Sequence, residues 1–128
     1  TSLMDTLNLC QFDWGATWQL YGPSTVAQVV NAVTGWETTL PELMEAGARR
    51  VNLMKVFNAR EGFDRDDDKL PPRLHEPLQG GVSDGVRVTE EEIERAKDLY
   101  YRLAGWDVET GNPTAARLAE LGIGWAVE

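Results

Sequence analysis

Two helix-start motifs limit the folds open to this chain more than any other feature of its sequence. Thr39 with Glu42, and Thr89 with Glu92, each have the spacing of a capping box. In a capping box the first side chain accepts a hydrogen bond from the backbone N–H three residues later. The second side chain accepts one from the first residue's own N–H, so a helix begins there. The sequence therefore predicts a helix at each motif.

Apolar residues follow each motif at the spacing that places them on one face of a helix. The first helix is predicted to end near Gly62 and the second at Gly105, because glycine readily adopts the left-handed conformation that closes a helix. The predicted stripe of the first helix consists of Leu40, Leu43, Met44, Gly47, Val51, Met54 and Phe57. The predicted buried face of the second consists of Ile93, Ala96, Leu99, Tyr100 and Leu103.

Two shorter helices are predicted at 24–34 and 112–122. A Pro-Ser pair opens the first, and an Asn-Pro pair opens the second. In the second, Leu118 and Leu121 should face inward. The first carries one apolar face, made of Val26, Val29, Val30 and Val33.

The remaining segments complete an all-α prediction. Residues 63–88 are rich in proline and glycine, which predicts a long loop of the kind that is functional or wraps another surface. Residues 1–21 show no clear period and are predicted to be irregular. No alternating stretch requires a sheet. We therefore expect one irregular helical domain over residues 1–128, with about four main helices.

Composition excludes several classes of function. The net charge of -9 would repel a phosphate backbone, so nucleic acid is not an expected partner. The apolar runs are too short to span a bilayer, so no membrane association is expected. A single cysteine rules out an internal disulfide and favours a reducing, cytoplasmic setting.

Cys10 has two interpretations. Lone cysteines are most often small buried hydrophobes, and the neighbouring Leu9 and Phe12 suit burial. Alternatively, the thiolate is a ligand to a metal or cluster. A four-iron cluster normally takes four cysteine ligands, so three would have to come from elsewhere.

The acidic run at 64–69 resembles a calcium-binding loop only in part. Its acids match the first three ligand positions, but Lys69 stands where glycine is needed and His75 where glutamate is needed. We therefore expect solvated charges or salt bridges that hold the loop. His75, the only histidine, is expected at the surface.

Three segments match one known family in order and spacing. They are D-T-L-N-L-C at 5–10, the long stretch F-N-A-R-E-G-F-D-R-D-D-D-K-L-P-P-R-L at 57–74, and Y-Y-R-L-A-G-W-D at 100–107 followed by L-A-E-L-G-I at 118–123. Together they resemble the C-terminal domain of the tungsten-containing aldehyde:ferredoxin oxidoreductase family.

The resemblance implies cofactors and site residues. Members of this family hold a tungsten bis-pterin cofactor (tungstopterin) beside a [4Fe-4S] cluster, and they oxidise aldehydes to carboxylic acids with ferredoxin as electron acceptor. An upstream C-x-x-C-x-x-x-C element supplies three cluster ligands, and the D-x-x-x-L-C element supplies the fourth. That correspondence places the fourth ligand at Cys10 and pterin contacts at Asp5 and Leu9. It makes residues 1–21 the segment that faces cofactor and cluster, and it assigns no catalytic residue to this chain.

The same resemblance implies partners and an alternative. The expected partners are the upstream domains of the same enzyme, ferredoxin and a small aldehyde, with a homodimer as a further possibility. By itself the chain should be inactive and hold no cofactor. The alternative is a non-catalytic helical module that keeps the fold for protein binding. A C-x-x-C-x-x-x-C element upstream of Thr1 would distinguish the enzyme from that module.

Overall fold

The computed structural model describes residues 2–14 and 22–127 of the chain. Their regular structure is helical, and the only pairing of strand type among them is an isolated bridge between Trp106 and Pro113. The prediction of an all-α chain is therefore confirmed. Two compact units are present, one made of residues 1–54 and 118–128 and the other of residues 55–117. We call them unit 1 and unit 2.

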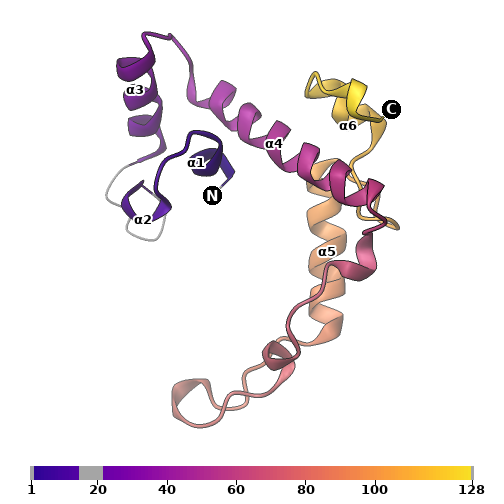
Figure 1. Ribbon diagram of the computed structural model, residues 1–128. Coiled ribbons are helices and arrows are strands. Elements are labelled where there is room, and N and C mark those ends of the chain that lie inside the picture. Colours follow the sequence, from indigo (N-terminus) through magenta and orange to yellow (C-terminus); the bar gives the residue numbers. More distant parts are fainter. Residues whose placement is uncertain (1, 15–21, 128) are drawn as a thin grey trace. The chain divides into compact units, whose positions relative to one another are not determined.

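Four helices lie where the sequence predicts them (Figure 1). They are α3 (Pro23–Thr34), α4 (Leu40–Arg60), α5 (Glu90–Ala104) and α6 (Ala115–Glu120). Both capping boxes form: Glu42 Oε2 accepts from the Thr39 N–H at 2.7 Å, and Glu92 Oε2 accepts from the Thr89 N–H at 2.8 Å. The two motifs thus set the first residues of α4 and α5.

The amino-terminal segment is more regular than predicted. It contains two short helices, α1 (Ser2–Thr6) and α2 (Gln11–Trp14), where the sequence predicted irregular chain. Helices this short are not stable alone, so packing rather than propensity holds them. Leu3 of α1 is 7% exposed and lies in the core of unit 1. Residues 15–21 of this segment lie outside the described residues.

The core of unit 1 joins α1, α3 and α4. Its buried members are Leu3, Val26, Val30 and Leu43. Val26 and Val30 confirm the predicted face of α3, whereas Val33 at its end is 81% exposed. Leu118 and Leu121 are buried, as predicted. Partly buried side chains pack around the core, namely Met4, Leu7, Leu9, Ala27 and Leu40.

Unit 2 contains the predicted long loop. Residues 63–88 hold no α-helix, only three short 3-10 turns, η1 (Arg65–Asp67), η2 (Pro72–His75) and η3 (Gly81–Ser83). Backbone hydrogen bonds close the loop on itself, for example from the Leu78 N–H to the Val86 carbonyl at 2.9 Å.

The predicted buried face of α5 is wrong. Leu99, Tyr100 and Leu103 are 59%, 51% and 78% exposed, while Tyr101 is 2% exposed. Polar contacts explain this difference. The side of α5 that carries Tyr101 and Asp98 packs inward, because Asp98 accepts a hydrogen bond from Arg65 of η1 and Tyr101 donates one to Asp68. None of the described helices is both long and apolar enough to cross a membrane.

Candidate cofactor-facing site

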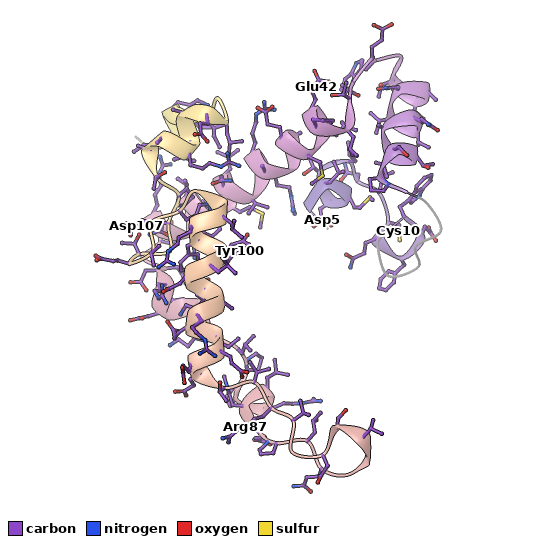
Figure 2. All side chains as sticks on the ribbon, turned by 180° about the vertical axis from the view of Figure 1, so that it is seen from behind. Asp5, Cys10, Glu42, Arg87, Tyr100 and Asp107 are labelled. Carbon is purple, nitrogen blue, oxygen red and sulfur yellow. The ribbon has the colours of Figure 1, made fainter. Side chains whose placement is uncertain are left out.

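The D-T-L-N-L-C segment begins on α1 and ends at the residue before α2 (Figure 2). A tight turn connects the two helices, with Asn8 in the left-handed region at φ 54°. The Leu9 N–H donates to the Met4 carbonyl at 2.9 Å, which fixes the turn against α1. Asp5 and Cys10 are therefore held on one short, hydrogen-bonded piece of backbone.

Asp5 has a partner that the sequence did not predict. Its Oδ2 accepts a hydrogen bond from Nη1 of Arg50, on α4, at 3.2 Å. Both side chains are more than a third exposed, so the pair orients the carboxylate without burying it. A carboxylate has about four lone-pair positions, so Asp5 can accept from Arg50 and from a ligand together. Forty-five residues separate Asp5 and Arg50, and no local pattern indicates such a contact.

Leu9 and Cys10 point to different surroundings. Leu9 is half-buried and packs against the core of unit 1. Cys10 is exposed and forms no disulfide, so the interpretation of this cysteine as a buried hydrophobe is wrong. Its carbonyl accepts from the N–H groups of Asp13 and Trp14 at 3.1 and 2.9 Å, which leaves the thiol as the group open to a ligand.

The metal-ligating side chains of this chain can fill one ligand position of an iron–sulfur cluster, but they do not form a complete metal site. Within residues 2–14 and 22–127 no three His, Cys, Asp or Glu side chains gather closely enough to hold a metal ion. A four-iron cluster needs four thiolates, and this chain offers Cys10. The described residues therefore could not hold such a cluster by themselves, and Cys10 could supply one ligand to it.

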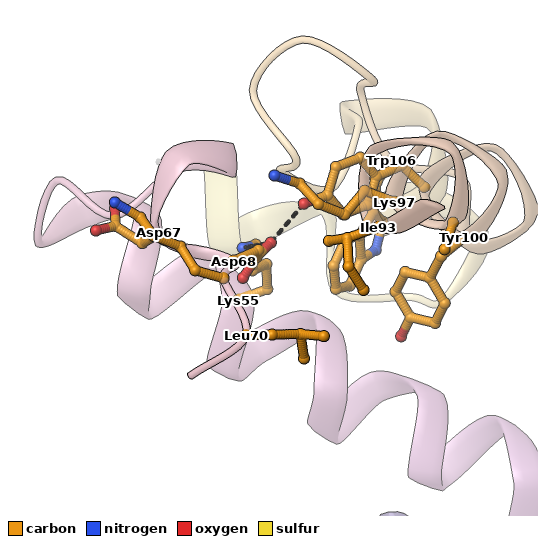
Figure 3. A pocket seen from close by; sticks show the side chains of 11 residues that line it. Lys55, Asp67, Asp68, Leu70, Ile93, Lys97, Tyr100 and Trp106 are labelled. Atoms are coloured by element: carbon orange, nitrogen blue, oxygen red, sulfur yellow. Dashed lines mark hydrogen bonds and ion pairs between the residues drawn. The ribbon is translucent and has the colours of Figure 1, made fainter. Parts of the chain in front are cut away.

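A second polar centre lies in unit 2, around Asp68 (Figure 3). Asp68 Oδ2 accepts from Lys55 Nζ at 2.8 Å and from the Tyr101 hydroxyl at 2.6 Å. The Lys55 ammonium also lies 5.7 Å from the ring centroid of Trp106. Burial raises the pKa of Asp68, but the hydrogen bonds from Lys55 and Tyr101 outweigh it, so the net pKa is below its ordinary value. Burial, and then the bond to Asp68, raise the pKa of the Tyr101 hydroxyl.

Arg65 joins the loop to α5. Its guanidinium donates to Glu94 at 2.5 Å, to Asp98 at 2.7 Å and to the Val108 carbonyl at 2.7 Å. It also lies over the Tyr101 ring, 5.5 Å from the centroid. The expectation that salt bridges hold the acidic run is confirmed by Arg65 and Asp68. Arg65 and Asp68 therefore connect segments within unit 2, and the hydrogen-bond partners named here all belong to that unit.

A hollow of about 550 Å³ opens beside the Asp68 centre, and Figure 3 shows its lining side chains. The lining is mostly apolar and aromatic, with Leu70, Ile93, Tyr100 and Trp106 among its members. His75 lines a neighbouring depression, and its Nδ1 lies 2.8 Å from the Val88 carbonyl, so it is half-buried rather than fully at the surface.

Comparisons with known proteins identify the family to which the chain belongs. The family model described as "Aldehyde ferredoxin oxidoreductase, domains 2 & 3" matches residues 1–123. The chain therefore belongs to the aldehyde ferredoxin oxidoreductase family, whose similar members are oxidoreductases.

Two relatives are both named tungsten-containing aldehyde ferredoxin oxidoreductase. The one from Pyrococcus furiosus is 36% identical over 125 residues, and the one from Pyrococcus abyssi is 33% identical over 128 residues. In each case the match covers 96% of this chain and 19% of the relative, so the chain spans about a fifth of their length.

A solved structure shares the fold. It is the active site complex BamBC of benzoyl coenzyme A reductase, in complex with 1,5 dienoyl-CoA. The likeness has a TM-score of 0.65 at 27% identity and covers 83% of this chain and 14% of that one.

Proposed function

We propose that this chain is the C-terminal part of a tungstopterin, [4Fe-4S] oxidoreductase that oxidises an aldehyde to a carboxylic acid and passes the electrons to ferredoxin. Residues 1–21 would face the cofactors, with Cys10 as the fourth cluster ligand and Asp5 and Leu9 as pterin contacts. The observation that carries the proposal is the exposed Cys10 thiol, held five residues from an Arg50-oriented carboxylate within a region that the family model matches.

In this proposal the chain's own residues bind and orient the pterin and the cluster. Cys10 would supply one thiolate to iron. The Asp5 carboxylate would accept charge-assisted hydrogen bonds from N–H groups of the pterin, and Arg50 would keep it in place. Leu9 would anchor the segment to the core of unit 1 and present its remaining exposed edge to the pterin. Because one short segment contacts both groups, their separation is set by rigid backbone.

When bound, the tungsten centre and cluster would supply the redox chemistry, which converts an aldehyde and water into a carboxylic acid, two protons and two electrons. In the overall reaction the aldehyde C–H bond breaks, a C–O bond forms with oxygen from water, and ferredoxin is reduced. The acid or base that handles the protons belongs to the part of the enzyme outside this chain.

Cys10→Ala and Cys10→Ser in the assembled enzyme test the ligand assignment. The alanine variant should lose the cluster, because a methyl group cannot bind iron, while the serine variant should keep a weakened one. Iron content and electron paramagnetic resonance of the reduced enzyme measure this. An alanine variant with full iron and an unchanged reduced-cluster signal would contradict the assignment.

Asp5→Asn and Arg50→Gln test the pterin contact. Asp5→Asn should lower tungsten and pterin content and leave iron unchanged, since only the charge-assisted bonds are lost. Arg50→Gln should give a smaller loss of the same kind, and Arg50→Lys should restore it in part. Equal loss of iron and tungsten in both variants would instead indicate general unfolding of the segment.

A further inference from the structure

One face of α5 is apolar and lies open to water. We call it the α5 stripe; it consists of Ile93, Ala96, Leu99, Tyr100 and Leu103. An amphipathic helix normally turns such a face into its own core. Here Leu103 is 78% exposed and Leu99 is 59% exposed, whereas the side chain of Lys97, which lines the hollow together with Ile93 and Tyr100, is only 13% exposed. A contiguous exposed apolar face is typical of an interaction surface.

The hollow is continuous with this stripe. Ile93, Ala96 and Tyr100 belong to both. Most of the charged groups that line the hollow are already bonded. Lys55 and Tyr101 both donate to Asp68, Lys97 donates to Glu94, and Asp67 accepts from the Asp64 N–H, while Lys69 completes the charged lining. Trp106, 8% exposed, supplies an aromatic wall. A charged small molecule would find its best partners occupied, whereas an apolar side chain would gain contact area.

We propose that the α5 stripe and the hollow form one docking surface for the part of the same enzyme that lies outside this chain, and that an apolar side chain of that part enters the hollow. The length of the relatives supports this occupant. The match covers only 19% of the Pyrococcus furiosus relative and 14% of the solved structure, so most of each of those proteins has no counterpart in this chain. A second copy is a poorer occupant, because each copy carries a net charge of -9 and the two would repel. The proposal rests on family membership and is independent of the cofactor assignment.

Cysteine labelling tests the stripe. Leu103→Cys lies on it, and Glu91→Cys is the matched control on α5, where the native side chain is 80% exposed. Each variant is treated with a maleimide, both as the 128-residue chain and within the assembled enzyme, and the labelled position is identified by peptide mass spectrometry. Leu103→Cys should react at least about tenfold more slowly in the enzyme than in the chain, since labelling would require local opening. The Glu91→Cys rates should agree.

Three results would overturn the proposal. Equal labelling of Leu103→Cys in both samples would show that nothing covers the stripe in the enzyme. Protection in the chain alone that disappears on dilution would assign the stripe to a second copy. Protection in the chain at every dilution would assign it to the chain's own unit 1. None of these results depends on iron or tungsten, so they are separable from the tests of Cys10 and Asp5.

A filling variant tests the hollow. Ala96→Trp should occupy the hollow from within and reduce the amount of chain that co-purifies with the rest of the enzyme. Glu91→Trp, on the same helix, should leave that amount unchanged. Circular dichroism of the chain shows whether each variant keeps its helices. A folded Ala96→Trp chain that assembles fully would overturn the assignment of the hollow.

Discussion

Asp68 connects three segments of unit 2. It receives two hydrogen bonds at one oxygen, from Lys55 and from Tyr101, and so joins the end of α4 to α5 through the acidic run. The Lys55 side chain is 10% exposed, and such a poorly solvated ammonium is stable only with a partner. The sequence predicted salt bridges in this run, but not their partners, because those lie 13 and 33 residues away.

Tyr101→Phe should lower the free energy of unfolding of unit 2 by about 1–2 kcal/mol. It removes one hydrogen bond to a charged acceptor and keeps the ring, and the 39% exposure of the Asp68 side chain places the loss at the lower end for such bonds. Tyr100→Phe is the control, since Tyr100 is 51% exposed. Hydrogen exchange of the α5 amides in denaturant measures the change. Equal effects of the two substitutions would show that the bond to Asp68 contributes nothing specific.

Acid should weaken unit 2. The pKa of Asp68 lies below its ordinary 3.8 in the folded chain, so ionised Asp68 stabilises the fold above that value, and the contribution is lost as pH falls through the lower folded pKa. Glu94 acts in the same direction, because its bonds to Lys97 and Arg65 lower its pKa from 4.5. The denaturation midpoint, followed from neutral pH to about pH 3, should therefore fall at the acid end.

Asp68→Asn is the control for this acid dependence. The variant should be less stable at neutral pH, and its midpoint should change less with acid. An Asp68→Asn midpoint that falls as steeply as that of the unchanged chain would show that the dependence arises from other carboxylates.

At the scale of elements, the capping boxes were the most informative local signals. Capping is a short-range interaction, so Thr39 and Thr89 located the first residues of α4 and α5 correctly. Burial depends on contacts between distant parts of the chain, and the prediction of the buried face of α5 was wrong. The apolar residues of α5 lie on one face as predicted, but Leu99, Tyr100 and Leu103 on that face are exposed. Polar partners at Arg65 and Asp68 decide which side of α5 packs.

Gly111→Ala should destabilise unit 2 more than Gly85→Ala. Both glycines have positive φ, 69° and 78°, where a Cβ costs about 1–2 kcal/mol. Only at Gly111 would the new Cβ meet another residue, the Tyr101 ring at 3.0 Å, while Gly85 has open space. Denaturation midpoints of the two variants give the difference. Equal losses would mean that the Tyr101 ring shifts without cost.

At the scale of the whole molecule, the chain belongs to a family of oxidoreductases and spans about a fifth of the length of the relatives it matches. Its all-α class was predictable from the helical signals, and its family from the motifs at 5–10, 57–74 and 100–107, which occur in the family's order along the chain. The proposed roles of Asp5, Leu9 and Cys10 come only from that resemblance and stay predictions. The Arg50 contact to Asp5 was not, since it forms only when α1 packs beside α4.

Iron-edge anomalous diffraction from crystals of the assembled enzyme tests the central claim most directly. The proposal places Cys10 Sγ among the ligands of one iron of the cluster. An anomalous peak within bonding distance of Cys10 Sγ, with three other thiolates around the same cluster, is the predicted result. An iron cluster whose four thiolates all come from outside this chain, with Cys10 away from every peak, would contradict it.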